Sequence, residues 1–152
     1  MVKVFITLIS VMFFIPRSAD IDMNGIRAGF GKAAEDKTLC KKMMEALEPM
    51  SANYVCLAYL GGYQAVWANH VMNPFSKLKT FNAGKENIEK AVKGDPQNIE
   101  IRIVRLSVQK NAPSFLDYDQ HQKEDEVFIK RNLPAVDNPV LTRLANEILK
   151  TK

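Results

Sequence analysis

Residues Tyr54–Leu60 read YVCLAYL, a run in which every side chain is apolar or aromatic. A helix that is apolar on all sides must be covered by neighbours over most of its surface, so this run predicts a central, buried helix. Gly61, Gly62 and Ala65 follow and give the helix a thin face. Because a glycine inside a helix costs about 1 kcal/mol, close packing against a neighbouring helix is the expected compensation. We expect this central helix to span residues 52–69.

Apolar residues at helical spacing continue upstream of this run. Residues 39–47 predict a helix that ends at Pro49, and Ser51 is then available to cap the central helix. Residues 22–34 predict a weaker first helix, because three glycines loosen it.

Downstream, an Asn or Asp directly before a proline occurs three times, at Asn73-Pro74, Asp95-Pro96 and Asn138-Pro139. An Asn or Asp side chain can accept a hydrogen bond from a free N–H at a helix start, and proline fits the first helical turn. Each pair therefore predicts the beginning of a helix.

Residues 97–110 are ambiguous, because three isoleucines alternate with charged residues as in a strand, while the apolar run then continues as in a buried helix. We favour the helix because both flanking segments are helical. Residues 111–118 predict a loop, and Asp119 with Gln122 predicts a capping box for a helix that runs to about Asn132. The sequence thus predicts an all-α fold of about six or seven helices, arranged as an antiparallel stack of helical hairpins.

The N-terminus has the order of a secretory signal peptide. Lys3 precedes an apolar stretch of twelve residues at 4–15, and Pro16–Ala19 then lead into acidic residues. A stretch of that length is shorter than the roughly 20 residues that a membrane-spanning helix needs. We expect cleavage after residue 19, a single all-helical domain over 20–152, and a periplasmic or secreted location. An uncleaved anchor or a buried strand is the alternative.

Charge argues against nucleic-acid binding. Removing residues 1–19 takes away Lys3 and Arg17 and no acidic residue, which leaves 19 basic and 17 acidic side chains and a net charge of +2. A nucleic-acid-binding face needs a stronger and more clustered positive charge. We also expect no stable membrane span after cleavage.

Cys40 and Cys56 are the two cysteines of the chain. If the helices around residues 39–47 and 52–69 are antiparallel, the two thiols lie at similar heights, and an oxidising compartment would favour a disulfide between them. Two small buried thiols are the alternative.

Part of the chain resembles known helical proteins. Residues 95–100 (DPQNIE) resemble the turn and helix start of tetratricopeptide-like repeats, although no 34-residue period and no tryptophan-leucine-glycine signature is present. The region from Leu57 to Phe128, about half of the chain, resembles an uncharacterised family of small exported bacterial proteins. The resemblance is carried by AYLGGY at 58–63, NPFSKLK at 73–79, IEIRIVRL at 99–106 and QKNAPSFLDY at 109–118. It implies an all-α fold and no particular activity.

The sequence contains no recognisable catalytic constellation. It has two histidines, no serine elbow, no paired zinc-type histidines and no Cys-x-x-Cys motif. Gly25–Lys32 departs from a phosphate-binding loop in its glycine spacing. We therefore expect no enzymatic activity, no cofactor and no metal.

Arg102, Arg105 and Gln109 predict a polar ridge on an otherwise apolar helix. The structural interpretation pairs the arginines with Glu100, Asp117 or Asp125, since charges near a core are normally satisfied. The functional interpretation is a fork that binds a carboxylate of a partner peptide or protein.

Four aromatic side chains complete the set of predicted binding residues. Phe115 and Tyr118 either plug the core or, if exposed, anchor an interface. Trp67 and His70 lie one turn apart near the end of the central helix.

We expect a non-catalytic exported module that binds a peptide or protein in the cell envelope. One alternative is a small-ligand binder or enzyme with a pocket around Trp67, His70, Arg102 and Tyr118. The other is a structural subunit of an envelope assembly, which would expose a large apolar patch.

Overall fold

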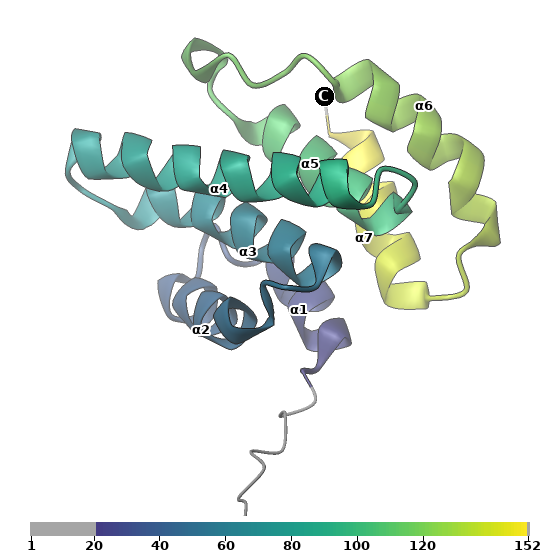
Figure 1. Cartoon of the computed structure of the whole chain (residues 1–152), viewed down its shortest axis with the longest axis horizontal. Helices are drawn as coiled ribbons and strands as arrows, with labels where there is room; N and C mark the ends of the chain where they lie inside the picture. The colour runs from purple at the N-terminus through teal and green to yellow at the C-terminus, as the bar shows by residue number, and fades with distance from the viewer. Residues whose placement is uncertain (1–20, 152) are drawn as a thin grey trace, which may run out of the picture.

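The computed structural model describes residues 21–151, and within that range every element is helical (Figure 1). The predicted signal peptide at residues 1–19 lies outside the described residues. The all-α prediction is confirmed, with seven α helices in the described part of the chain. Their bounds are α1 (Met23–Phe30), α2 (Lys37–Leu47), α3 (Tyr54–Trp67), α4 (Pro74–Gly94), α5 (Ile99–Asn111), α6 (Gln122–Asn132) and α7 (Pro139–Lys150). Short 3-10 helices lie in four of the connections between the α helices: η1 (Glu48–Met50), η2 (Ala68–His70), η3 (Ser114–Leu116) and η4 (Leu133–Ala135).

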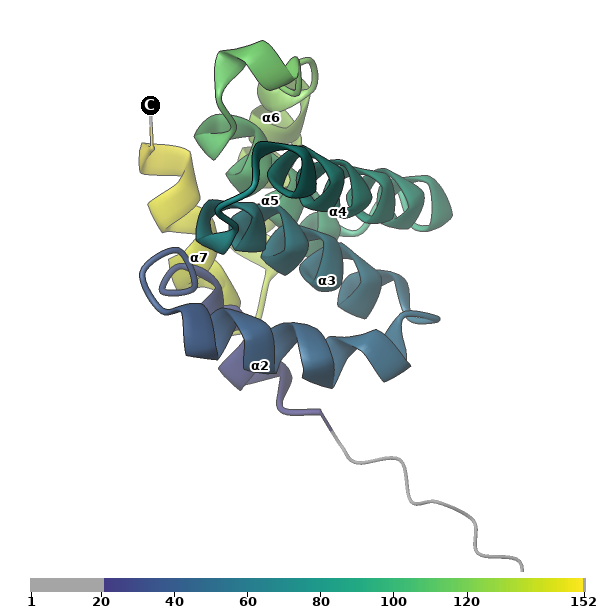
Figure 2. The ribbon, with the colours of Figure 1, turned by 90° about the vertical axis from the view of Figure 1, so that its left-hand side faces the viewer.

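Helix α3 is the centre of the fold, as its all-apolar sequence predicts. Its side chains from Cys56 to Tyr63 are all buried, and it packs against α1, α2, α4 and α5. Figures 1 and 2 show α2 on one side of α3 and α4 on the other. The buried apolar side chains of α1 to α7 join in one continuous core.

The thin face of α3 is what lets α4 pack so closely along it. A Cβ atom added at Gly61 would lie 2.5 Å from the carbonyl oxygen of Gly84, and one added at Gly84 would lie 2.5 Å from the oxygen of Gly61. Neither helix could hold a side chain at this crossing without moving away from the other. The predicted close approach is therefore confirmed, and the glycine on the second helix is Gly84.

Two of the three predicted helix starts are confirmed. The side chain of Asn73 accepts a hydrogen bond from Ser76 N, and that of Asn138 accepts one from Leu141 N. The third start is wrong by three residues: α5 begins at Ile99, and its cap is Asn98. Asp95 instead ends α4, where its carboxylate accepts a hydrogen bond from the Asn98 amide.

Two other predicted caps are also wrong. The cap of α3 is Asn53 and not Ser51, because the Asn53 side chain accepts hydrogen bonds from Val55 N and Cys56 N. The capping box at Asp119 is not formed, since α6 begins at Gln122 after His121, without a side-chain cap. The predicted end of this helix at Asn132 is correct.

The last helix returns to the first. Helix α7 packs against both α1 and α5, so the first and last helices of the described chain lie side by side. In an open stack each unit contacts only its neighbours, and the α1–α7 contact departs from that pattern. None of the helices in residues 21–151 has the length and apolar character needed to span a bilayer.

Candidate functional site

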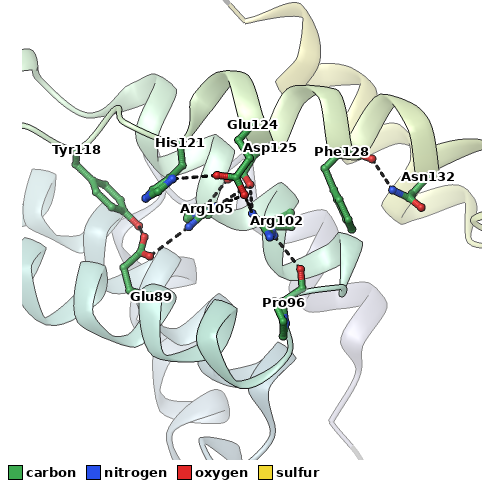
Figure 3. A network of polar contacts seen from close by, with 10 residues as sticks. All are labelled: Glu89, Pro96, Arg102, Arg105, Tyr118, His121, Glu124, Asp125, Phe128 and Asn132. Atoms are coloured by element: carbon green, nitrogen blue, oxygen red, sulfur yellow. Dashed lines mark hydrogen bonds and ion pairs between the residues drawn. The ribbon is translucent and has the colours of Figure 1, made fainter.

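The predicted arginine fork is buried and already holds a carboxylate of this chain. Arg105 donates from Nε to Asp125 Oδ2 at 2.7 Å and from Nη2 to Asp125 Oδ1 at 2.8 Å. Arg102 donates from Nη1 to Asp125 Oδ1 at 2.8 Å and from Nε to the Pro96 carbonyl at 3.1 Å (Figure 3). The Asp125 side chain is 0% exposed and that of Arg105 is 3% exposed.

Acidic side chains at the edge of this cluster complete its charge balance. Glu124 accepts a hydrogen bond from Arg102 Nη1 at 2.7 Å, and Glu89 lies 3.3 Å from Arg105 Nη1. The hydrogen bond from Arg102 lowers the pKa of Glu124 below its ordinary value, with a smaller contribution from His121. Burial alone would lower the pKa of Arg105, but its hydrogen bond and ion pair with Asp125 outweigh burial and raise it. Both arginines therefore carry charge that the protein itself compensates.

This arrangement matches the structural interpretation of the arginines, with Asp125 as their shared partner. The other two predicted partners do not bind these arginines. Glu100 binds Arg27 of α1 through two hydrogen bonds of 2.6 and 2.9 Å, and Asp117 is exposed in the loop. Because the arginine donors point inward to Asp125, they are not available to a binding partner. Its role is to join α5 to α6.

Tyr118 and Gln109 lie beside this cluster and are also buried. The Tyr118 hydroxyl donates to Glu89 Oε1 at 2.6 Å, and burial together with that hydrogen bond raises the pKa of Tyr118 well above its ordinary value. Gln109 is 1% exposed, and its side-chain amide has no partner within the described residues. Tyr118 is the core plug that the sequence predicted as one of two outcomes.

His70 and Trp67 lie elsewhere and hold the end of α3 to the turn before α2. His70 Nε2 lies 2.8 Å from the carbonyl oxygen of Ala33. The Trp67 and His70 rings are 5.6 Å apart, and the Lys37 amine lies 5.4 Å from the Trp67 ring centre. Neither residue lines either of the two cavities described below. The structure thus does not bring Trp67, His70, Arg102 and Tyr118 to a common pocket, and that prediction is corrected.

The two cysteines are free, buried thiols with different neighbours, so the disulfide is not formed. Cys40 Sγ lies 3.4 Å from the Tyr63 carbonyl oxygen, and Cys56 Sγ lies 3.9 Å from Met23 Sδ. Burial raises the pKa of the Cys40 thiol to about 11. Residues 21–151 contain no group of three His, Cys, Asp or Glu side chains placed to hold a metal ion.

Phe115 is the one predicted binding residue that lies exposed beside a cavity. Its side chain is 82% exposed, whereas Tyr118, three residues later, is buried. Between them Asp117 adopts a left-handed conformation (φ 46°), a turn that Asp tolerates better than most residues. The chain therefore presents one aromatic ring to solvent and the other to the core.

The cavity beside Phe115 has a volume of about 460 Å³ and is mostly apolar. It lies where the end of α3, the first turns of α4, the end of α5 and η3 meet. Its apolar lining includes Leu78, Phe81, Val108, Phe115 and Leu116. Binding cavities are typically concave, apolar and of about 300–1,000 Å³, with a few polar groups. This apolar pocket fits that description better than the second cavity of about 420 Å³, which lies between α1 and α7 and has four charged residues in its lining.

Three large apolar side chains are exposed around the start of α4, and one of them, Leu78, lines the pocket. Met72, Phe75 and Leu78 are among the most exposed large apolar residues of the described chain, and Pro74 and Leu78 line the pocket directly. The sequence does not single out Leu78, because its spacing from Phe81 and Ile88 is that of a core residue of the same helix. Met72 and Phe75 carry a usable signal, because they flank the helix start at Pro74 and lie outside this core spacing.

Comparison with known proteins identifies no relative. No family model matches the chain, and no curated protein or solved structure matches it. The resemblance to an exported bacterial family therefore stays a prediction.

Proposed function

We propose that this protein is a non-catalytic, exported binding module that captures a peptide or protein partner in the cell envelope. The observation that carries the proposal is the apolar pocket with Leu78 and Phe115 exposed at its edge. Phe75 is exposed one helical turn before Leu78 on α4. Soluble proteins rarely leave a contiguous set of large apolar side chains in water unless a partner covers it. Buried aromatic anchors in pockets are also where binding energy concentrates.

The size of the available apolar surface supports a partner of useful affinity. Burying a Phe or Leu side chain that was exposed is worth about 1.5–3 kcal/mol. Two phenylalanines and a leucine would together supply several kcal/mol before the costs of association are subtracted. The predicted tetratricopeptide-like hairpin arrangement is part of this proposal: consecutive helices α2, α3 and α4 pack in order, and such folds present concave binding surfaces.

The same pocket also supports a second candidate, binding of a small apolar ligand, because about 460 Å³ lies within the range of ligand cavities. This replaces the predicted pocket around His70 and Arg102. A structural role in an envelope assembly would use the exposed apolar side chains in the same way as a partner protein.

The test compares two variants of the tagged full chain in capture from an envelope extract. Leu78→Ser with Phe115→Ser removes the apolar edge, and Val127→Ser removes an exposed apolar side chain of α6 that does not line the pocket. We expect the unmodified protein and the Val127 variant to retain the same partner and the double variant to lose it, while circular dichroism shows equal helicity for all three. Equal retention by the double variant would remove the pocket as the binding site.

A further inference from the structure

The charge in the lining of the apolar pocket is positive. None of the residues that line the pocket is an Asp or a Glu. Lys77 is the charged residue of the lining in the described structure, and Asn69 and Asn111 are its other polar residues. The pocket therefore combines an apolar floor with a positive edge.

The cation at this edge is not compensated by a carboxylate of the protein. Lys77 is exposed, and within residues 21–151 it has no carboxylate within the 4.0 Å of an ion pair. Lys110 of α5 is different, because its amine lies 2.7 Å from Glu126. The charge of Lys110 is thus compensated within the protein, while that of Lys77 remains available to a partner.

We propose that the occupant of the pocket is an apolar peptide segment flanked by acidic residues. This inference rests on the proposed function and specifies the chemistry of the partner. The apolar residues of the segment would lie against Leu78 and Phe115, and a carboxylate beside them would lie next to Lys77. A second copy of this chain is a poorer occupant, because a symmetric contact through this face would bring the same lysines together.

The charge preference can be measured with three synthetic peptides of equal length and identical leucine and phenylalanine content. Their flanking positions carry Glu, Gln or Lys, and binding to the full chain is followed by fluorescence anisotropy. We expect the Glu peptide to bind at least about tenfold more tightly than the Lys peptide at low salt, with a difference that shrinks as salt screens the charges. A preference for the Lys peptide, or equal affinity for all three, would overturn the inference.

Variants of α4 locate the effect. Lys77→Gln should reduce the preference for the Glu peptide to about threefold or less and leave the affinity for the Gln peptide unchanged. The matched control is Lys90→Gln, which removes the same charge from the same helix about 20 Å further along its axis. An equal loss of preference in the control variant would mean that overall charge, and not the pocket edge, selects the peptide.

The remaining outcomes separate this inference from the proposed function. In one outcome, the Gln peptide binds, Leu78→Ser with Phe115→Ser weakens that binding, and the charge of the flanking residues does not change the affinity. The pocket is then the binding site, and only the acidic character of the partner is wrong. If the double variant binds all three peptides like the unmodified protein, the proposed function fails as well. Binding to anionic phospholipid vesicles with no binding of any peptide would make a lipid the occupant and overturn the peptide proposal. If sedimentation shows dimers of the unmodified protein and monomers of Phe115→Ser, the occupant is a second copy of this chain, and the peptide proposal is overturned.

Discussion

Arg105 donates two parallel hydrogen bonds to Asp125, one of 2.7 Å from Nε to Oδ2 and one of 2.8 Å from Nη2 to Oδ1. This two-point geometry is the strongest that a guanidinium and a carboxylate can form. Arg102 adds a third bond to the same carboxylate. The buried Asp125 side chain of α6 thus holds two arginines of α5, in addition to the Arg102–Glu124 and Lys110–Glu126 pairs between the same helices.

Replacing Asp125 by alanine should destabilise the protein by about 3–5 kcal/mol, because it leaves two buried guanidinium groups without their carboxylate. Chemical unfolding of the full chain measures the loss. The control is Glu45→Ala, which breaks an exposed pair with Lys41 and should cost less than about 0.5 kcal/mol. A cost below about 1 kcal/mol for Asp125→Ala would contradict the central role of this carboxylate.

Stability should fall as the pH falls below about 5. The pKa of Glu124 is lowered by its hydrogen bond from Arg102, and that of Glu126 by its hydrogen bond from Lys110. A carboxyl group with a lowered pKa in the folded state stabilises the protein above its unfolded pKa, and that contribution is lost as the pH falls through the folded pKa. Urea midpoints measured from about pH 6 to pH 3 should therefore decrease.

The Glu124→Gln variant should show a shallower decrease over the same range, since it has one fewer carboxyl group to protonate. Glu45→Gln is the matched control, and its midpoints should run parallel to those of the unmodified protein. Parallel curves for Glu124→Gln would show that its ion pair contributes nothing.

Gly84→Ala should destabilise the protein by about 1–3 kcal/mol, because the added methyl group has to push α3 and α4 apart. Gly31→Ala is the control. An added Cβ there meets no atom within 4 Å, and the backbone at φ −66° and ψ −24° suits alanine. That variant should be neutral or gain up to about 1 kcal/mol. Thermal unfolding measures both, and equal melting temperatures would contradict the close crossing.

Both cysteines should resist alkylation in the folded protein. Burial keeps the Cys40 pKa near 11 and raises that of Cys56, so little reactive thiolate forms at neutral pH. We expect iodoacetamide to label two thiols after unfolding without a reductant and almost none before. Failure to label the unfolded, unreduced chain would show that a disulfide had formed.

Much of the secondary structure could be predicted because its causes are local. The side chain of Asn73 or Asn138 caps a helix through an N–H only three residues away, so the signal and its effect lie in one short segment. The errors at Ser51, Asp95 and Asp119 have the same origin: a neighbouring residue offered an equivalent acceptor or turn. Patterns of this kind locate a helix but leave its first residue uncertain by a few positions.

The binding residues were harder to predict because their surroundings are set by distant parts of the chain. Asp125 was one of three partners predicted for the arginines, and only the packing of α6 against α5 selected it for Arg105, twenty residues earlier. Glu100 found its partner in Arg27, 73 residues earlier. The pairing of acidic with basic side chains depends on how the helices pack, and the helical periodicity of the sequence does not contain that information.

The sequence alone predicted that the described chain folds into helices and that the central helix contains Tyr54–Leu60, of which Cys56–Leu60 are buried, because hydrophobic periodicity and capping act within single turns. Only the tertiary structure decided that Tyr118 fills the core while Phe115 faces solvent, and that the arginines are satisfied while Lys77 is not. Side chains of similar chemistry are sorted by the space and charge around them, and those are properties of the packed helices together.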